Sequence, residues 1–399
     1  MNLATKQTKV RVWRLCVCPK AWIFPLMAGA MLCGVNAAAA GRDLLPTDDA
    51  QVIEVLAPRV LPTSLTPGAK VTPEAAAVAA RAAIVQARAT ADPRYLGRAQ
   101  AVLAPWWDQA EAPVALAILQ ATVQQARHEF AAAHATLTRA LQRDPTQAQG
   151  WLTLATLERL AGRYPQALMA CAQVERAGAG LYAKACSLET RSMQGQHDAA
   201  RQGFEALRRQ SAGIATQAWL LSLLAESEER AGRDAAAWRA YQTSLALAPD
   251  GYTALAAADM LLRTGRAPAA LAMLADQPAS DAVLLRRAQA LKLAKDPAWQ
   301  GLATILRERF AELEARGDDP AAHARERAIG WLWLDGDAAR AAEAARLNMR
   351  LQKEPLDWWL ALHSADLAGQ TGEVALLRDA LAAIGLRDAR LTRWTGGKP

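Results

Sequence analysis

The sequence is poor in the residues and motifs on which most catalytic and metal sites depend. It has five cysteines in 399 residues, and aromatic residues make up 6% of it. No Cys/His group has the spacing of a zinc site, and there is no G-x-S-x-G motif, P-loop or dinucleotide-binding glycine motif. The absence of an Asn-x-Ser/Thr site gives no indication of a glycosylated eukaryotic product. These absences argue against the common enzyme and metalloprotein classes.

Apolar residues, in contrast, are abundant. Hydrophobic types make up 52% of the chain and charged types 21%, which is too apolar a composition for a disordered protein. The 24 glycines and 19 prolines are too few for a fibrous or low-complexity protein. The composition predicts a folded, helix-rich chain that forms two or three ordinary domains or one elongated repeat array.

The net charge of +7 is concentrated at the N-terminus. Residues 1–40 hold five of the 46 basic residues and no acidic residue, which leaves 41 basic against 39 acidic residues, or about +2, for the rest. A chain so nearly balanced has no strong electrostatic attraction to nucleic acid or to an anionic membrane. We therefore expect no nucleic-acid partner.

Residues 1–40 have the order of segments that is typical of a secretory signal peptide. A basic stretch precedes an apolar run at 21–35, and small residues follow, so that cleavage is expected after Ala40 or Ala38. The run is shorter than the ~20 residues of a membrane span and contains Pro25. An uncleaved N-terminal anchor is the alternative. The expected location is the bacterial periplasm, with no transmembrane insertion after signal removal.

Cysteine usage agrees with export but leaves the redox state open. Three of the five cysteines lie in the predicted signal, and Cys171 and Cys186 remain. An even number of cysteines in an oxidising compartment permits a disulfide. Two small buried thiols in a helical core are the alternative.

The segment 41–90 is expected to begin extended and to end in a first helix. It contains five prolines up to Pro73, which disfavour long helices there. Thr72, directly before Pro73, has the character of a helix N-cap, and the alanine-rich sequence after it predicts a helix to about Ala91.

A repeat organises the chain between residues 91 and 277. In the unit that starts at residue 148, Trp151, Leu154 and Ala155 stand at positions 4, 7 and 8, with Gly162 at position 15 and Ala167 at position 20. The same register fits five units that start near 114, 148, 181, 218 and 251, with one short insertion near 210–213. This pattern resembles the 34-residue helix-turn-helix unit of tetratricopeptide-repeat (TPR) proteins.

The resemblance implies an all-α, right-handed solenoid. Small residues at positions 8 and 20 allow the two helices of a unit to cross closely, and glycine at position 15 supplies the positive φ of the turn. No unit buries its apolar face alone, so stability comes from stacking. Position 24 of one unit and position 6 of the next can be neighbours, which would bring Cys171 and Cys186 together.

The pattern degrades beyond Asp276. Residues 278–399 read as divergent helical repeats and a C-terminal cap, with Gly336 and Ala341 at the diagnostic places of one loose unit. We expect Trp394 and the glycine-rich end after it to form a frayed tail.

The resemblance also implies a candidate binding site. In such solenoids, positions 2, 5, 9 and 12 of the first helix face a concave groove. Three successive units place an aromatic column at position 2 and an acidic column at position 9, formed by Tyr182, Trp219, Tyr252, Glu189, Glu226 and Asp259. Such a surface suits a basic or amphipathic partner segment. Basic residues at positions 12 and 13 offer these acids internal partners: Arg159, Arg230 and Arg263.

Together these features predict a protein that binds rather than catalyses, with no cofactor and no metal ion. His128 is followed by His134, six residues on, whereas a helical metal pair needs four. The expected function is an exported scaffold or adaptor that holds a protein or peptide segment in its groove. An accessory subunit of envelope polysaccharide or secretion machinery is one alternative, and an enzyme with a site in the groove or the C-terminal region is another. The partner, the pathway and the oligomeric state are left open.

Overall fold

The computed structural model describes residues 71–317 and 319–396. The chain divides into two units, Met1–Thr66 and Pro67–Pro399, and every described residue belongs to the second. The predicted signal peptide and most of the predicted lead lie outside the described residues. Within the described ranges, no helix combines the length and the apolar character that crossing a bilayer requires.

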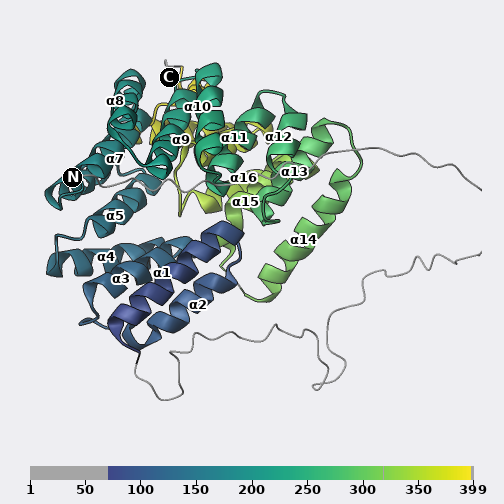
Figure 1. Ribbon diagram of the computed structural model, residues 1–399. Helices are drawn as coiled ribbons and strands as arrows, with labels where there is room; N and C mark the ends of the chain where they lie inside the picture. The colour runs from purple at the N-terminus through teal and green to yellow at the C-terminus, as the bar shows by residue number, and fades with distance from the viewer. Residues whose placement is uncertain (1–70, 318, 397–399) are drawn as a thin grey trace, which may run out of the picture. The chain divides into compact units, whose positions relative to one another are not determined.

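The described part of the chain consists of helices joined by short turns, with no β-strand (Figure 1). The α-helices are α1 (Pro73–Thr90), α2 (Arg94–Leu103), α3 (Val114–Ala126), α4 (Phe130–Arg143), α5 (Ala148–Leu160), α6 (Tyr164–Arg176), α7 (Gly180–Met193), α8 (His197–Gln210), α9 (Ile214–Arg230), α10 (Asp234–Leu247), α11 (Gly251–Arg263), α12 (Ala267–Met273), α13 (Asp281–Leu293), α14 (Trp299–Ala315), α15 (Ala324–Gly330), α16 (Ala338–Asn348), α17 (Pro355–Leu367), α18 (Thr371–Ile384) and α19 (Thr392–Thr395). Short 3-10 turns lie at Ala104–Trp106, Pro320–His323 and Ala389–Leu391, and a π-helical turn lies at Trp331–Asp335.

Several helices begin where a polar side chain satisfies their first free amides. The hydroxyl of Thr72 accepts from the backbone N–H of Ala75 at 3.3 Å, with Pro73 in the first turn of α1. Asp250 caps α11 in the same way, accepting from the N–H of Thr253 at 2.8 Å. The local sequence therefore fixes these starts, because the capping groups lie within three residues of the amides they bind.

The helices α3–α12 form antiparallel pairs that stack into a solenoid (Figure 1). Small residues lie where the two helices of a pair meet, and the alanines at positions 8 and 20 are fully buried in four units: Ala121 and Ala133, Ala155 and Ala167, Ala225 and Ala237, Ala258 and Ala270. The predicted all-α solenoid of helix-turn-helix repeats is confirmed, and the close crossing of small residues explains its regularity.

The start of the fourth helix pair differs from the sequence register. The register starts this unit at Ala218, whereas α9 begins four residues earlier, at Ile214. The inserted residues therefore extend α9 to 17 residues rather than lengthen the loop before it. The division of the chain into the segments 41–90, 91–277 and 278–399 stays a prediction.

Trp394 is packed rather than frayed, so that the expectation for this residue was wrong, while residues 397–399 lie outside the described residues. Trp394 lies in α19 and is 7% exposed. Its indole N–H donates to Asp366 Oδ2 at 3.3 Å, and its ring meets the imidazole of His363 edge-on. A large aromatic side chain anchors this end because it finds an apolar surface on α17.

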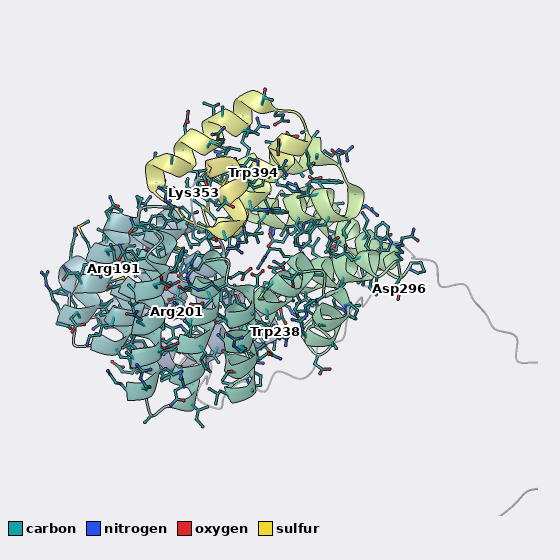
Figure 2. The ribbon with its side chains drawn as sticks, turned by 90° about the horizontal axis from the view of Figure 1, so that it is seen from above. Arg191, Arg201, Trp238, Asp296, Lys353 and Trp394 are labelled. Atoms are coloured by element: carbon teal, nitrogen blue, oxygen red, sulfur yellow. A yellow bond between two sulfur atoms is a disulfide. The ribbon has the colours of Figure 1, made fainter. Side chains whose placement is uncertain are left out.

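The loops of the C-terminal part return to the solenoid and contact the turns inside its helix pairs. The backbone N–H of Lys353 donates to the carbonyl of Leu160 at 2.7 Å, and that of Arg387 donates to the carbonyl of Met193 at 2.8 Å. Leu160 and Met193 end α5 and α7, so these bonds satisfy carbonyls that have no partner inside their helices. Figure 2 shows Lys353 in the yellow C-terminal part, close to the teal solenoid helices.

Glycine in these turns serves both the backbone and the contact. Gly232 has φ +73°, and a Cβ added there would lie 3.0 Å from the Cβ of Ala389. A side chain at this position would strain the turn and push the C-terminal loop away. A shared apolar core supports the same contact, in which Tyr164 and Met193 pack with Trp358 and Leu386.

Candidate functional site

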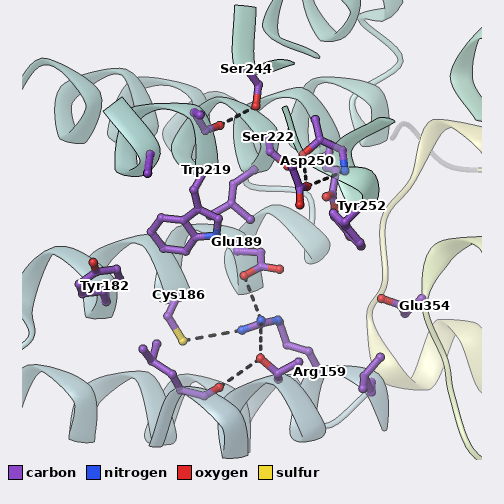
Figure 3. A pocket seen from close by; sticks show the side chains of 18 of the residues that line it. Arg159, Tyr182, Cys186, Glu189, Trp219, Ser222, Ser244, Asp250, Tyr252 and Glu354 are labelled. Carbon is purple, nitrogen blue, oxygen red and sulfur yellow. Dashed lines mark hydrogen bonds and ion pairs between the residues drawn. The ribbon is translucent and has the colours of Figure 1, made fainter. Parts of the chain in front are cut away.

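The first helices of the solenoid pairs line a cavity of about 670 Å³ (Figure 3). Its walls come from α3, α5, α7, α9 and α11, from the end of α10 and from Glu354, which directly precedes α17. Five of the six residues proposed from the repeat register line it: Tyr182, Glu189, Trp219, Glu226 and Tyr252. Equivalent positions of successive repeat units therefore place these side chains on one concave surface.

The aromatic residues leave apolar area open to a ligand. Tyr252 is 62% exposed and Tyr182 is 43% exposed. The ring centroids of Tyr182 and Trp219 are 5.5 Å apart at a tilt of 40°, and Trp219 also packs on the core formed by α7–α10. Figure 3 shows the Trp219 indole between the two tyrosines in this view. Large, half-exposed rings held on rigid helices are the usual anchors of binding interfaces.

Glu189 is neutralised within the wall of the cavity. Its Oε2 lies 3.0 Å from Arg159 Nη2, and the same guanidinium donates to the hydroxyl of Thr156 at 3.2 Å. Arg159 is 9% exposed, and its other terminal nitrogen lies 3.7 Å from Cys186 Sγ. This arrangement agrees with the internal pairing that the sequence offered for Arg159.

Glu226 has a weaker set of partners. Its Oε2 is 3.6 Å from Arg230 Nη1, and its Oε1 is shielded from solvent and has no hydrogen-bond partner. Burial raises the pKa of Glu226 to about 7, although Arg230 and a hydrogen bond from Tyr252 act in the opposite direction. The charge of Glu226 raises the pKa of Tyr252 above its usual value. This end of the cavity therefore favours the protonated form of Glu226.

The structure directs Asp259 away from the cavity. Its two carboxylate oxygens each lie 2.7 Å from a guanidinium nitrogen of Arg286, on α13. Asp259 is not among the residues that line the cavity. The solenoid continues into α13, where Arg286 forms a bidentate ion pair that holds the Asp259 carboxylate between α11 and α13.

Two acidic residues of the cavity were absent from the repeat register. Asp250 caps α11, and Glu354 precedes α17 in the distant C-terminal part. Glu354 Oε2 accepts from Arg325 at 2.6 Å, and its backbone N–H donates to Asp357 at 2.8 Å. The order Glu-Pro-x-Asp indicates a capped helix start, but only the tertiary fold brings Glu354 to the cavity.

The two remaining cysteines are bonded in the structure. Cys171 on α6 and Cys186 on α7 form a disulfide, and Cys186 also lines the cavity. The bond ties the second helix of one pair to the first helix of the next. In the ranges that the structure describes, no group of three or more His, Cys, Asp or Glu side chains is arranged to hold a metal ion. Instead, the Nε2 atom of His134 lies 2.8 Å from the Oε1 atom of Glu158.

Comparison with known proteins relates the chain to others by fold alone. No family model matches the sequence, and no curated protein matches it. Among solved structures, a Rap protein complexed with competence and sporulation factor matches with a TM-score of 0.51 and 12% identity, over 78% of this chain and 85% of that one. The human IFIT1 dimer with PPP-AAAA matches with a TM-score of 0.46 and 12% identity, over 78% and 73%. A tetratricopeptide repeat protein from Parabacteroides merdae matches with a TM-score of 0.36 and 14% identity, over 72% and 99%.

The fold and the repeat register together define the class of this protein. The five helix pairs, the buried small residues at the helix crossings and the glycine turns are those of a TPR protein. The chain has the TPR fold, with further helices that return to the solenoid.

Proposed function

We propose that this chain is a binding scaffold of the bacterial periplasm that holds a segment of a partner protein in the cavity of its solenoid. The single observation that carries the proposal is the exposure of Tyr182 and Tyr252 beside Trp219 inside a concave surface. The exposed parts of these rings are available to a ligand, and aromatic rings supply large contact area at low entropic cost. The TPR fold is one that presents extended concave surfaces for binding.

The size of the cavity supports a short segment as the ligand. About 670 Å³ lies within the range of small-ligand sites, about 300–1,000 Å³. A few residues of an extended chain fit such a volume better than a folded domain. The Rap protein of similar fold was solved in a complex with competence and sporulation factor, so this fold is compatible with a bound partner.

Export is part of the proposal and rests on the sequence. Residues 1–40 have the basic, apolar and small-residue order of a signal peptide. The Cys171–Cys186 disulfide supports it, because such bonds persist mainly in oxidising compartments. Protein recovered from the periplasm is expected to begin at Gly41 or Ala39. Recovery of the intact chain from the cytosol alone would contradict export.

A pull-down from envelope extract tests the binding role. The mature chain should retain a partner, and the variant with Tyr182→Ala and Tyr252→Ala should lose most of it, since two exposed anchors are removed. Adding Trp219→Ala should abolish retention. The matched control replaces two exposed apolar residues that do not line the cavity, by Val78→Ala and Leu376→Ala, and each of these residues is 67% exposed.

The outcomes separate the candidate functions. Retention by the tyrosine variant at the level of the control would show that the cavity does not bind the partner. Circular dichroism and the melting temperature must match between variant and control for this comparison. Tryptophan fluorescence that changes on addition of envelope saccharides, without protein retention, would instead favour an accessory role in polysaccharide machinery.

A further inference from the structure

The charged residues that line the cavity are mostly acidic. They comprise four carboxylates and one guanidinium: Glu189, Glu226, Asp250, Glu354 and Arg159. Arg159 is committed to Glu189 at 3.0 Å. Asp250 is occupied by the cap of α11, where one oxygen accepts from both the N–H and the hydroxyl of Thr253 at 2.8 Å. Glu226 and Glu354 remain as the acids with incomplete compensation.

Glu354 shares its basic partner Arg325 with a second carboxylate. Arg325 donates to Glu354 Oε2 at 2.6 Å and also to both oxygens of Asp357 at 2.7 Å. Asp357 is fully buried and receives a further bond from Asn348 at 2.6 Å. One guanidinium thus serves two carboxylates, and the group carries a net charge of −1.

Glu226 has one cationic partner, Arg230, but the pair is long. The 3.6 Å separation exceeds the length of a charge-assisted hydrogen bond, about 2.7–2.9 Å. Arg230 Nε donates to Ser192 at 3.2 Å, and Arg230 Nη2 is a shielded donor without a partner. Glu226 Oε1 is a shielded acceptor without a donor, and buried acceptors in native proteins nearly always have one.

Neighbouring charges reinforce this deficit. Glu189 and Glu354 raise the pKa of Glu226, in addition to the effect of burial. The same three carboxylates raise the pKa of Tyr252. Glu226 on α9 and Tyr252 on α11 therefore both favour their protonated forms at this end of the cavity.

We propose that the Glu226 end of the cavity receives one lysine or arginine side chain of the bound partner segment. This inference rests on the proposed function and names the chemistry of the ligand. The cation pairs with the partly exposed carboxylate of Glu226 and is attracted by Glu354, while the exposed ring of Tyr252 offers a cation–π surface. Tyr182 and Trp219 contact the apolar neighbours of that side chain in the segment.

The aromatic end of the cavity selects a peptide over a free polyamine. A small diamine can satisfy Glu226 and Glu354, but it leaves the open area of Tyr182 and Trp219 unused. A segment with apolar residues beside its cation uses both ends, and hydrophobic contact adds affinity in proportion to the area buried. Charge complementarity at one end and apolar area at the other therefore specify an amphipathic, basic segment.

Capped random pentapeptides with one fixed central residue test the inference with the mature chain. Four pools carry lysine, arginine, norleucine or glutamate at the centre, and retention on the immobilised protein is measured. We expect the lysine and arginine pools to be retained about tenfold better than the norleucine pool. Glu226→Gln should remove this preference, while Glu205→Gln on α8, outside the cavity, should keep it.

The pH dependence gives an independent readout. Because the cation binds the ionised form of Glu226, whose pKa is about 7 in the empty cavity, retention of the lysine pool should fall as the pH drops from 8 to 6. The Glu226→Gln variant should lose this dependence. Arg230, Glu189, Glu354 and Tyr252 face Glu226 and remain unchanged in that variant.

The outcomes distinguish this inference from the proposed function. Equal retention of all pools, dependent on Tyr182 and Tyr252, overturns the cation site but leaves the scaffold function intact. Retention of no pool also overturns the cation site, and the pull-down then decides the function by itself. Spermidine that competes with the lysine pool at equal concentration overturns the choice of a peptide, since the apolar end would then contribute nothing.

Discussion

The disulfide between α6 and α7 gives the most direct test of how this solenoid is stabilised. Cys171 and Cys186 are 15 residues apart in sequence, and both are buried. Reducing the bond leaves every other contact in place, so that its effect isolates the covalent link. We expect the reduced protein to remain folded but to be less stable, because the unfolded chain regains the freedom that the link removes.

The magnitude follows from the size of the loop that the bond closes. For a loop of 15 residues, chain entropy predicts a loss of about 3 kcal/mol at 25 °C. Unfolding entropy is about 2 cal/mol/K per residue, so a unit as long as Pro67–Pro399 should melt about 4 °C lower. In a repeat array the loss is local, and amides of α6 and α7 should exchange up to about a hundredfold faster.

The assay compares oxidised and reduced mature chain by thermal melting and by hydrogen exchange of peptides from α6 and α7. Peptide mapping without reductant first establishes that the two sulfurs are bonded. The matched control carries Cys171→Ala and Cys186→Ala, and it should melt at the same temperature with and without reductant. Peptides from α13 and α14, which are distant in the array, should exchange alike in all samples.

Two results would refute the reasoning. Free thiols at both positions in protein from the periplasm would mean that the bond does not form in the cell. A bonded protein whose reduction changes neither the melting temperature nor the exchange of α6 and α7 would mean that stacking alone fixes these helices and that the loop entropy is irrelevant.

Three further predictions concern single side chains. The pKa of Glu226 is raised from 4.5 to about 7, so ionisation of Glu226 destabilises the folded state above pH 7 and has no such effect below pH 4.5. The Glu226→Gln variant should therefore have a free energy of unfolding in urea that is higher by up to about 3 kcal/mol at pH 8 and unchanged at pH 4. Gly232→Ala should cost more than the roughly 1–2 kcal/mol expected from its φ alone, whereas Gly265→Ala, with φ +75° and open space, should cost only that much in the same assay. Asp357→Ala should cost about 3–5 kcal/mol, because it removes the bidentate partner of Arg325, and an unchanged urea midpoint would contradict a structural role for this pair.

The sequence alone determined the features that depend on near neighbours. Helix caps such as Thr72 act over three residues, and the small residues at the helix crossings recur with each unit. The same register brought Tyr182, Trp219 and Tyr252 to one surface, because equivalent positions of stacked units share a face. The pairing of Arg159 with Glu189 also followed from the repeat, since they lie on successive first helices.

Only the tertiary structure decided where the C-terminal part would lie. Arg390 reaches Glu229 across 161 residues of sequence, and Glu354 joins a cavity built from helices far earlier in the chain. No periodic pattern encodes such contacts, because they depend on how the stacked pairs curve and which turns they expose. The position of Asp259 outside the groove has the same cause. Arg286 on α13 donates two hydrogen bonds to Asp259, and the repeat register of a single unit gives no information about this partner.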